Sequence, residues 1–155
     1  MEPQGAAPTR RPFSWGPTNG RSRRAFRRAA VVWGLFLLAL TSWPSPPEVP
    51  IVSAIPDFDK LVHAFLYGVE GFLLHRAIAW PASATSAWLR ALAVAGAISV
   101  WAMADEIHQV WIPGRSMEAT DALSDTAGGF AGALAAAILG RAPSPRVSPS
   151  RSPRP

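Results

Sequence analysis

Four residues with ionisable side chains recur at helical spacing in one stretch of the chain. Asp59, His63, Tyr67 and Glu70 are separated by four, four and three positions, so a helix would carry them on one face. Histidine exchanges a proton near neutral pH, which suits it to acid–base chemistry or to binding an anion. Glu70 falls within an apolar segment, where a charged group is costly and commonly marks a site or pathway. A protonated Glu70 that only links helices by a hydrogen bond is the alternative, and the sequence leaves both open.

A second polar group lies further along the chain, close to the end of another apolar run. Asp105 and Gln109 are four positions apart, and Glu106 and Gln109 are three apart, with His108 beside them. One helical face can therefore present two carboxylates and an amide. Such a face can orient a cationic side chain or accept hydrogen bonds from a ligand.

Arg115 follows in a Pro-Gly turn, between this acidic group and a later one formed by Asp121 and Asp125. A planar guanidinium is well suited to hold a phosphate or a carboxylate. In the structural alternative, Arg115 pairs with Asp105, Glu106 or Asp121. Asp121 and Asp125 open an apolar run, so Asp121 can also serve as a helix cap or complement the helix dipole.

Apolar segments long enough for helices must position these residues. We predict an all-α integral membrane bundle of four transmembrane helices, at about 29–43, 59–80, 88–110 and 120–140. The first segment is short for a span, although flanking arginines can snorkel and Trp33 and Trp43 suit interfacial positions. The proline-rich stretch 41–58 should be a loop, because proline removes backbone donors. Residues 1–28 and 141–155, rich in Pro, Ser and Arg, are predicted to be disordered basic tails around the domain 29–140.

Charge placement orients this bundle. The chain is 49% apolar and 16% charged, with a sequence pI near 11.2. Its basic residues flank the apolar middle, which favours membrane topology over nucleic-acid binding. With both termini inside, only Lys60 and Arg115 of the basic residues face outward, whereas every acidic residue except Glu2 and Glu70 does. The absence of cysteine excludes disulfides, zinc–thiolate sites and a thiol nucleophile.

Two further patterns concern packing and processing. Gly128, Gly132, Ala136 and Gly140 recur every four residues, which predicts a close helix-packing seam within the bundle or in a dimer. The stretch 22–26 resembles a twin-arginine export signal. No small-x-small cleavage site follows it and three further spans do, so we expect the segment to be retained.

The motifs together resemble the VanZ-like family of small bacterial membrane proteins over roughly residues 30–140. The resemblance rests on Asp59-Lys60-x-x-His63-x-x-x-Tyr67, on Asp105-Glu106-x-x-Gln109-x-x-x-Pro113-Gly114-Arg115-Ser116, and on Asp121 with Thr126-x-Gly128. It places weight on Asp59, Lys60, His63, Tyr67, Glu106, Gln109, Arg115, Asp121 and Gly128. Asp125 stands where family members commonly have Asn. The founding member is linked to low-level teicoplanin resistance, and the resemblance does not imply resistance by this chain.

Three functions follow as hypotheses. The first is an envelope protein that binds an anionic cell-wall precursor or lipid headgroup without a cofactor or metal. Arg115, Lys60 and His63 would supply positive charge, and Asp59, Tyr67, Asp105, Glu106, Gln109, Asp121 and Asp125 would complete the site. The second is an enzyme acting on a lipid-linked phosphate, with His63 as base and Mg²⁺ as the ion that oxygen ligands favour. The third is a small transporter component that uses Glu70. In each case we expect a multi-pass inner-membrane protein, its polar site extracytoplasmic, with the bilayer as partner, no nucleic acid and an open oligomeric state.

Overall fold

The computed structural model describes residues 18–45, 56–80 and 86–140. Within these ranges the chain forms four α-helices and no strand, which confirms the all-α prediction. The helices are α1 (Gly20–Thr41), α3 (Phe58–Ala77), α4 (Ala87–Gln109) and α5 (Ala119–Leu139). The last three bounds lie close to the predicted segments, because charged and turn-forming residues flank each apolar run.

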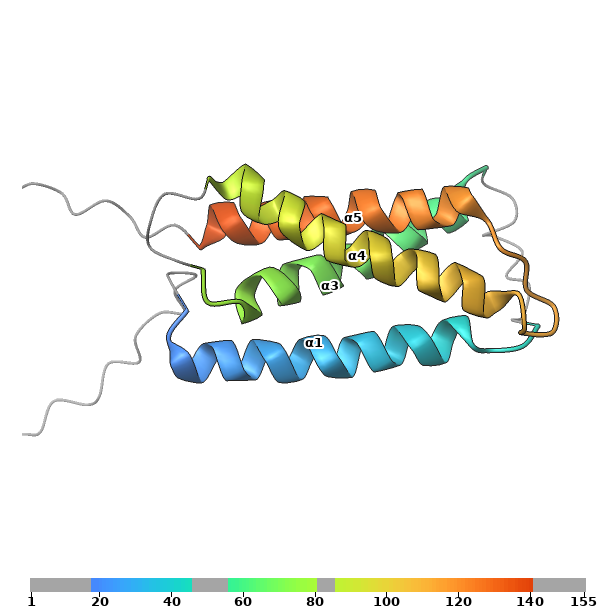
Figure 1. Cartoon of the computed structure of the whole chain (residues 1–155), viewed down its shortest axis with the longest axis horizontal. Helices are drawn as coiled ribbons and strands as arrows, with labels where there is room; N and C mark the ends of the chain where they lie inside the picture. The colour runs from blue at the N-terminus through green and yellow to red at the C-terminus, as the bar shows by residue number, and fades with distance from the viewer. Residues whose placement is uncertain (1–17, 46–55, 81–85, 141–155) are drawn as a thin grey trace, which may run out of the picture.

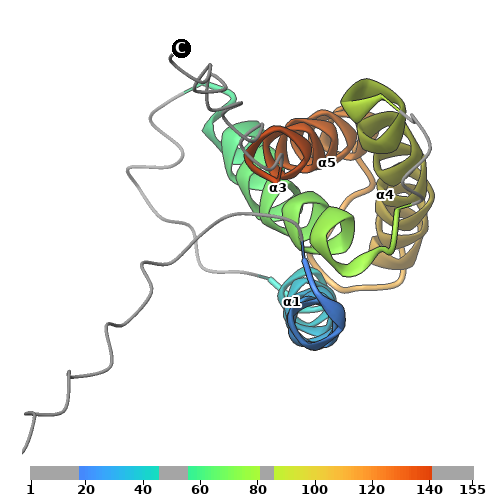
Figure 2. The same ribbon diagram turned by 90° about the vertical axis from the view of Figure 1, so that its left-hand side faces the viewer.

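Successive helices run in opposite directions, so each end of the bundle brings together the starts of two helices and the ends of the other two (Figure 1). We call the end where α1 and α4 finish and α3 and α5 begin the acidic end. The opposite end, where α1 and α4 begin, is the basic end. The most extensive contact is between α3 and α5; α4 packs on α5, and α1 packs on α3. Figure 2, a view along the bundle, shows α1 and α5 each beside α3, and α4 beside α5.

The start of α1 differs from the prediction. Residues 20–28, expected to belong to a disordered tail, form the first turns of this helix. Asn19 is its N-cap, and its Oδ1 accepts a hydrogen bond from Ser22 N at 2.9 Å. Arginine and alanine are good helix formers, so a run of positive charge does not by itself prevent a helix. The remaining predicted tails, 1–17 and 141–155, and most of the proline-rich loop (46–55) lie outside the described residues.

Glycines allow the backbones of α3 and α5 to approach closely. A Cβ atom on Gly128 would meet the carbonyl oxygen of Ala64, and one on Gly132 would meet that of Gly68. Gly71 on α3 faces Gly129 in the same way. The predicted small-residue seam therefore lies between α3 and α5, and it sets the position of the polar face of α3 relative to α5.

Two of the described helices are long and apolar enough to cross a membrane, α4 with 23 residues and α5 with 21. Large apolar side chains also lie exposed on the outer surface of the bundle. Val31, Val32 and Leu35 on α1, Val100 on α4 and Leu123 on α5 are each more than half exposed. Such a surface suits contact with lipid better than contact with water.

Candidate functional site

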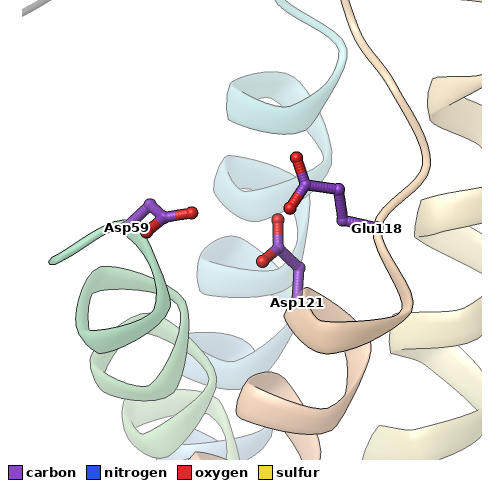
Figure 3. Close-up of side chains that lie close together, drawn as sticks. All are labelled: Asp59, Glu118 and Asp121. Carbon is purple, nitrogen blue, oxygen red and sulfur yellow. The ribbon is translucent and has the colours of Figure 1, made fainter. Parts of the chain in front are cut away.

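Lys60, at the start of α3, lies among three carboxylates at the acidic end. Its Nζ is 2.9 Å from Asp59 Oδ2, 2.8 Å from Asp121 Oδ1 and 3.3 Å from Glu118 Oε2. Figure 3 shows Asp59 at the start of α3 opposite Glu118, which immediately precedes α5, and Asp121, in the first turn of α5. Asp59 and Glu118 are about half exposed, whereas Asp121 is largely covered. The lysine thus neutralises part of a cluster that joins α3 to α5.

The same three carboxylates have the spacing of a cation site. One oxygen from each of Asp59, Glu118 and Asp121 lies within 4.8 Å of the others. The Lys60 ammonium is within hydrogen-bonding distance of all three, so it already supplies the positive charge that a bound ion would provide. The arrangement acts as an ion-pair network rather than as an open coordination site.

His63, one turn further along α3, pairs with α5. Its Nδ1 is 2.9 Å from Asp125 Oδ1, and its Nε2 is 3.6 Å from Asp121 Oδ2. With Asp125 ionised, its carboxylate can only accept a hydrogen bond, and His63 Nδ1 then carries the proton. Asp125 is 1% exposed. Asp125, which differs from the Asn that the resemblance indicates as common at this position, is therefore the main partner of His63 in this chain.

Asp105 connects three helices. Its Oδ2 accepts a hydrogen bond from the Tyr67 hydroxyl of α3 at 2.9 Å, and its Oδ1 accepts one from the Thr41 hydroxyl of α1 at 2.8 Å. All three side chains are buried. Sequence reasoning missed Thr41, although a hydroxyl at the end of an apolar run, on the same side of the bundle as Asp105, is a usable signal.

Glu106 holds the turn between α4 and α5. Its Oε2 accepts a hydrogen bond from the backbone N–H of Glu118 at 2.7 Å, and the Gln109 amide donates to its Oε1 at 3.5 Å. Glu118, which the sequence analysis did not single out, is the N-cap residue of α5 and makes no side-chain cap bond. Asp121 therefore is not the cap; it lies in the first turn, where its charge also complements the helix dipole.

Arg115 lies in the loop whose two ends are tied together by Glu106. Gly114 adopts φ 77°, a left-handed conformation that glycine tolerates, and Ser45 N donates to Pro113 O at 3.1 Å. The Arg115 side chain is half-buried, and its Nε has no hydrogen-bond partner. The structural alternative, a pairing with Asp105, Glu106 or Asp121, is absent from the described part of the chain, where all three carboxylates have other partners.

Glu70 lies apart from the acidic end. It is 2% exposed and lines a cavity of about 380 Å³ with Leu35 of α1 and Trp101 of α4. Its Oε2 has no hydrogen-bond partner in the described structure. Glu70 thus belongs to the same face of α3 as His63 and Tyr67 but not to their network.

A family model described as VanZ/LLP1 matches residues 11–140 of the chain. The chain belongs to the VanZ/LLP1 family. This confirms the resemblance, and the match begins earlier than residue 30, so it includes the whole of α1. All the polar residues of the acidic end lie within the VanZ/LLP1 match. Comparison with curated proteins and with solved structures gives no match.

Proposed function

We propose that the protein is a multi-pass bacterial inner-membrane protein whose acidic end faces outward. Support comes from charge sidedness, since cytoplasmic segments of membrane proteins carry an excess of arginine and lysine. Of the described basic residues, only Lys60 and Arg115 lie at the acidic end. The others are at the starts of α1 and α4 and the end of α3, at the basic end. All four helices span the bilayer in this proposal.

Sidedness can be tested with single cysteines, because the natural chain has none. Ser116 lies in the exposed α4–α5 turn, and Gly20 lies at the exposed start of α1. An impermeant maleimide added to intact spheroplasts should label Ser116→Cys and leave Gly20→Cys unlabelled until lysis. The opposite labelling pattern would show that the basic end faces outward, contrary to the proposal.

The function proposed for the outward end is binding the anionic headgroup of a lipid or cell-wall precursor. The observation that carries it is the contrast between Arg115 and the other two cations. Lys60 and His63 are matched by carboxylates, whereas Arg115 has a buried Nε without an acceptor and makes no ion pair within the described ranges. Arg115 therefore has donors available for a phosphate or carboxylate. Exposed Asp59 and Glu118 oxygens can accept hydrogen bonds from sugar or amide groups of the same ligand.

Native mass spectrometry from mild detergent tests this role. Wild-type protein should retain a lipid or glycolipid that Arg115→Ala loses, with at least a tenfold fall in the bound fraction. Arg24→Ala, an exposed arginine at the other end, is the matched control and should retain the ligand. If Arg115→Ala and Arg24→Ala retained the lipid or glycolipid equally, the proposed binding role of Arg115 would be contradicted.

A second candidate is an enzyme acting on a lipid-linked phosphate, and the His63–Asp125 pair favours it. A carboxylate that holds Nδ1–H orients the ring and leaves Nε2 to exchange a proton. His63→Gln should then abolish phosphate release from an undecaprenyl-type phosphate while the protein remains folded. The candidate is eliminated if the wild type shows no turnover with Mg²⁺ or without it.

A further inference from the structure

At the basic end, hydrogen-bond donors are buried without acceptors. His75, in the last turn of α3, is 6% exposed, and neither of its ring nitrogens has a hydrogen-bond partner. The Nε of Arg90, in the first turns of α4, is also buried and without one. Buried donors are nearly always satisfied, so each of these groups needs an explanation.

Packing holds these side chains in place. The Trp80 indole lies against the His75 ring, with 5.3 Å between ring centroids, and its N–H donates to the His75 carbonyl at 3.0 Å. Arg76 stacks its guanidinium 5.3 Å from the centre of the Phe26 ring of α1. At Gly140, which follows α5, a Cβ atom would come within 2.6 Å of Arg76 Nη1. Residues of α1, α3 and α4 and the C-cap residue of α5 thus lie around the group.

Within the described residues, no acidic side chain pairs with His75 or Arg90. The positive charges of Arg76 and Arg90 both act on the His75 ring. Every carboxylate in the described ranges other than Glu70 lies at the acidic end, and Glu70 faces the cavity beside Trp101. His75 and Arg90 therefore both have buried nitrogens without partners, and no carboxylate of the described residues pairs with either side chain.

We infer that Arg90 and His75, with Arg76 beside them, form a binding site for a phosphate group at the basic end. A phosphate offers several oxygens that can accept from Arg90 and from a His75 N–H at once, and arginine matches its geometry. The headgroup of an anionic phospholipid and free phosphate share this chemistry. Basic pockets between helices on the cytoplasmic side of membrane proteins bind such headgroups. This site lies at the opposite end from Arg115 and does not depend on the function proposed there.

Thermal unfolding of the full-length protein in detergent micelles tests the inference. The additives are phosphatidylglycerol, phosphatidylcholine and inorganic phosphate, each titrated separately, because a ligand of the folded state raises the melting temperature. We expect phosphatidylglycerol to stabilise the wild type and Arg90→Gln to bind it about tenfold more weakly. Arg24→Gln removes the same charge from an exposed position and should behave as the wild type.

The additives separate the two sources of the phosphate. Stabilisation by phosphatidylglycerol alone identifies a lipid headgroup, whereas equal stabilisation by inorganic phosphate, lost in Arg90→Gln, identifies free phosphate at the same site. The inference is overturned if phosphatidylcholine acts as strongly as phosphatidylglycerol, or if Arg90→Gln and Arg24→Gln bind alike.

His75→Phe provides a second test should Arg90→Gln fail to fold. The change keeps a ring to pack against Trp80 and removes both nitrogens that lack partners. Without an anion, the variant should unfold at the wild-type temperature or higher, because no hydrogen bond is lost. With phosphatidylglycerol, its melting temperature should rise less than that of the wild type. An equal rise in both proteins would show that His75 does not contact the ligand.

Discussion

The two ends of the bundle handle buried polarity in opposite ways. At the acidic end, carboxylates and their donors are matched within the protein: Lys60 to Asp121, His63 to Asp125, and Tyr67 to Asp105. At the basic end, His75 and Arg90 keep buried nitrogens without acceptors. A network whose hydrogen bonds are satisfied within the protein mainly holds the helices in position. Donors without acceptors can still form hydrogen bonds to a ligand.

This difference changes which residues are expected to bind. Seen in the sequence alone, the dense carboxylates and histidine of the acidic end are the natural centre of a site. In the structure most of them already bind one another. Buried nitrogens without a hydrogen-bond partner in the described ranges remain on Arg115 and His108 at that end and on Arg90 and His75 at the other. Substitutions that act on one end and spare the other test this division.

Gly128→Leu should have the largest effect. A side chain at Gly128 collides with the backbone of Ala64, next to His63, so α3 and α5 must separate at the acidic end. Overpacking a tight contact costs about 1–3 kcal/mol and sometimes more, and here the shift also breaks the Lys60 and His63 pairs. We expect a large fall in melting temperature, measured by circular dichroism in micelles.

Gly96→Leu is the matched control for that substitution. It makes the same chemical change on α4, where a Cβ atom has nothing within 4 Å. Its melting temperature should stay close to that of the wild type. Similar losses in both variants would mean that the close approach of α3 and α5 does not limit stability.

Tyr67→Phe should have the next largest effect, and it compares the two ends directly. The change removes the hydroxyl that donates to Asp105 and leaves a buried carboxylate oxygen unsatisfied, at a cost of about 1–3 kcal/mol. His75→Phe also replaces a polar ring with an apolar one, yet it breaks no side-chain hydrogen bond found in the described residues. In micelles without anionic lipid, the first variant should be less stable and the second should not. If both variants were less stable than the wild type, the contrast between the two ends would be contradicted.

Much of the fold could be predicted from the sequence, because prolines, turn residues and charges interrupt the apolar runs close to where α3, α4 and α5 begin and end. The start of α1 could not. The composition of residues 20–28 predicts part of a tail, but Asn19 caps a helix there, and Arg27 Nε donates to the carbonyl of Ala77 at 3.3 Å. That contact joins residues far apart in the chain, so no local pattern indicates it.

The sequence could predict which residues belong to the candidate site, but not which of them form hydrogen bonds or ion pairs with one another. Helical spacing placed His63 and Tyr67 on one face, and the structure agrees. Their partners depend on how α3 lies against α4 and α5, which the glycine seam determines. The pairing of Thr41 with Asp105, and the absence of partners among the described residues for the buried nitrogens of His75 and Arg90, depend on tertiary packing.

Lys60→Met should have the smallest effect, and it tests whether the lysine substitutes for an ion. Removing a partly exposed ammonium from its carboxylate partners should cost about 1 kcal/mol. The variant leaves Asp59, Glu118 and Asp121 with oxygens within 4.8 Å of one another and no cation between them. Ca²⁺, which accepts such oxygen ligands flexibly, should then raise the melting temperature of Lys60→Met but not of the wild type.

A second change separates a specific site from general charge screening in this experiment. Lys60→Met combined with Asp121→Asn removes the carboxylate that lies closest to the lysine, so the response to Ca²⁺ should fall. Exposed carboxylates that only attract ions loosely would respond similarly in wild type and in both variants, and to Na⁺ at matched ionic strength. A Ca²⁺ response limited to Lys60→Met would show that, in the wild type, Lys60 supplies the positive charge that the three carboxylates of the acidic end require.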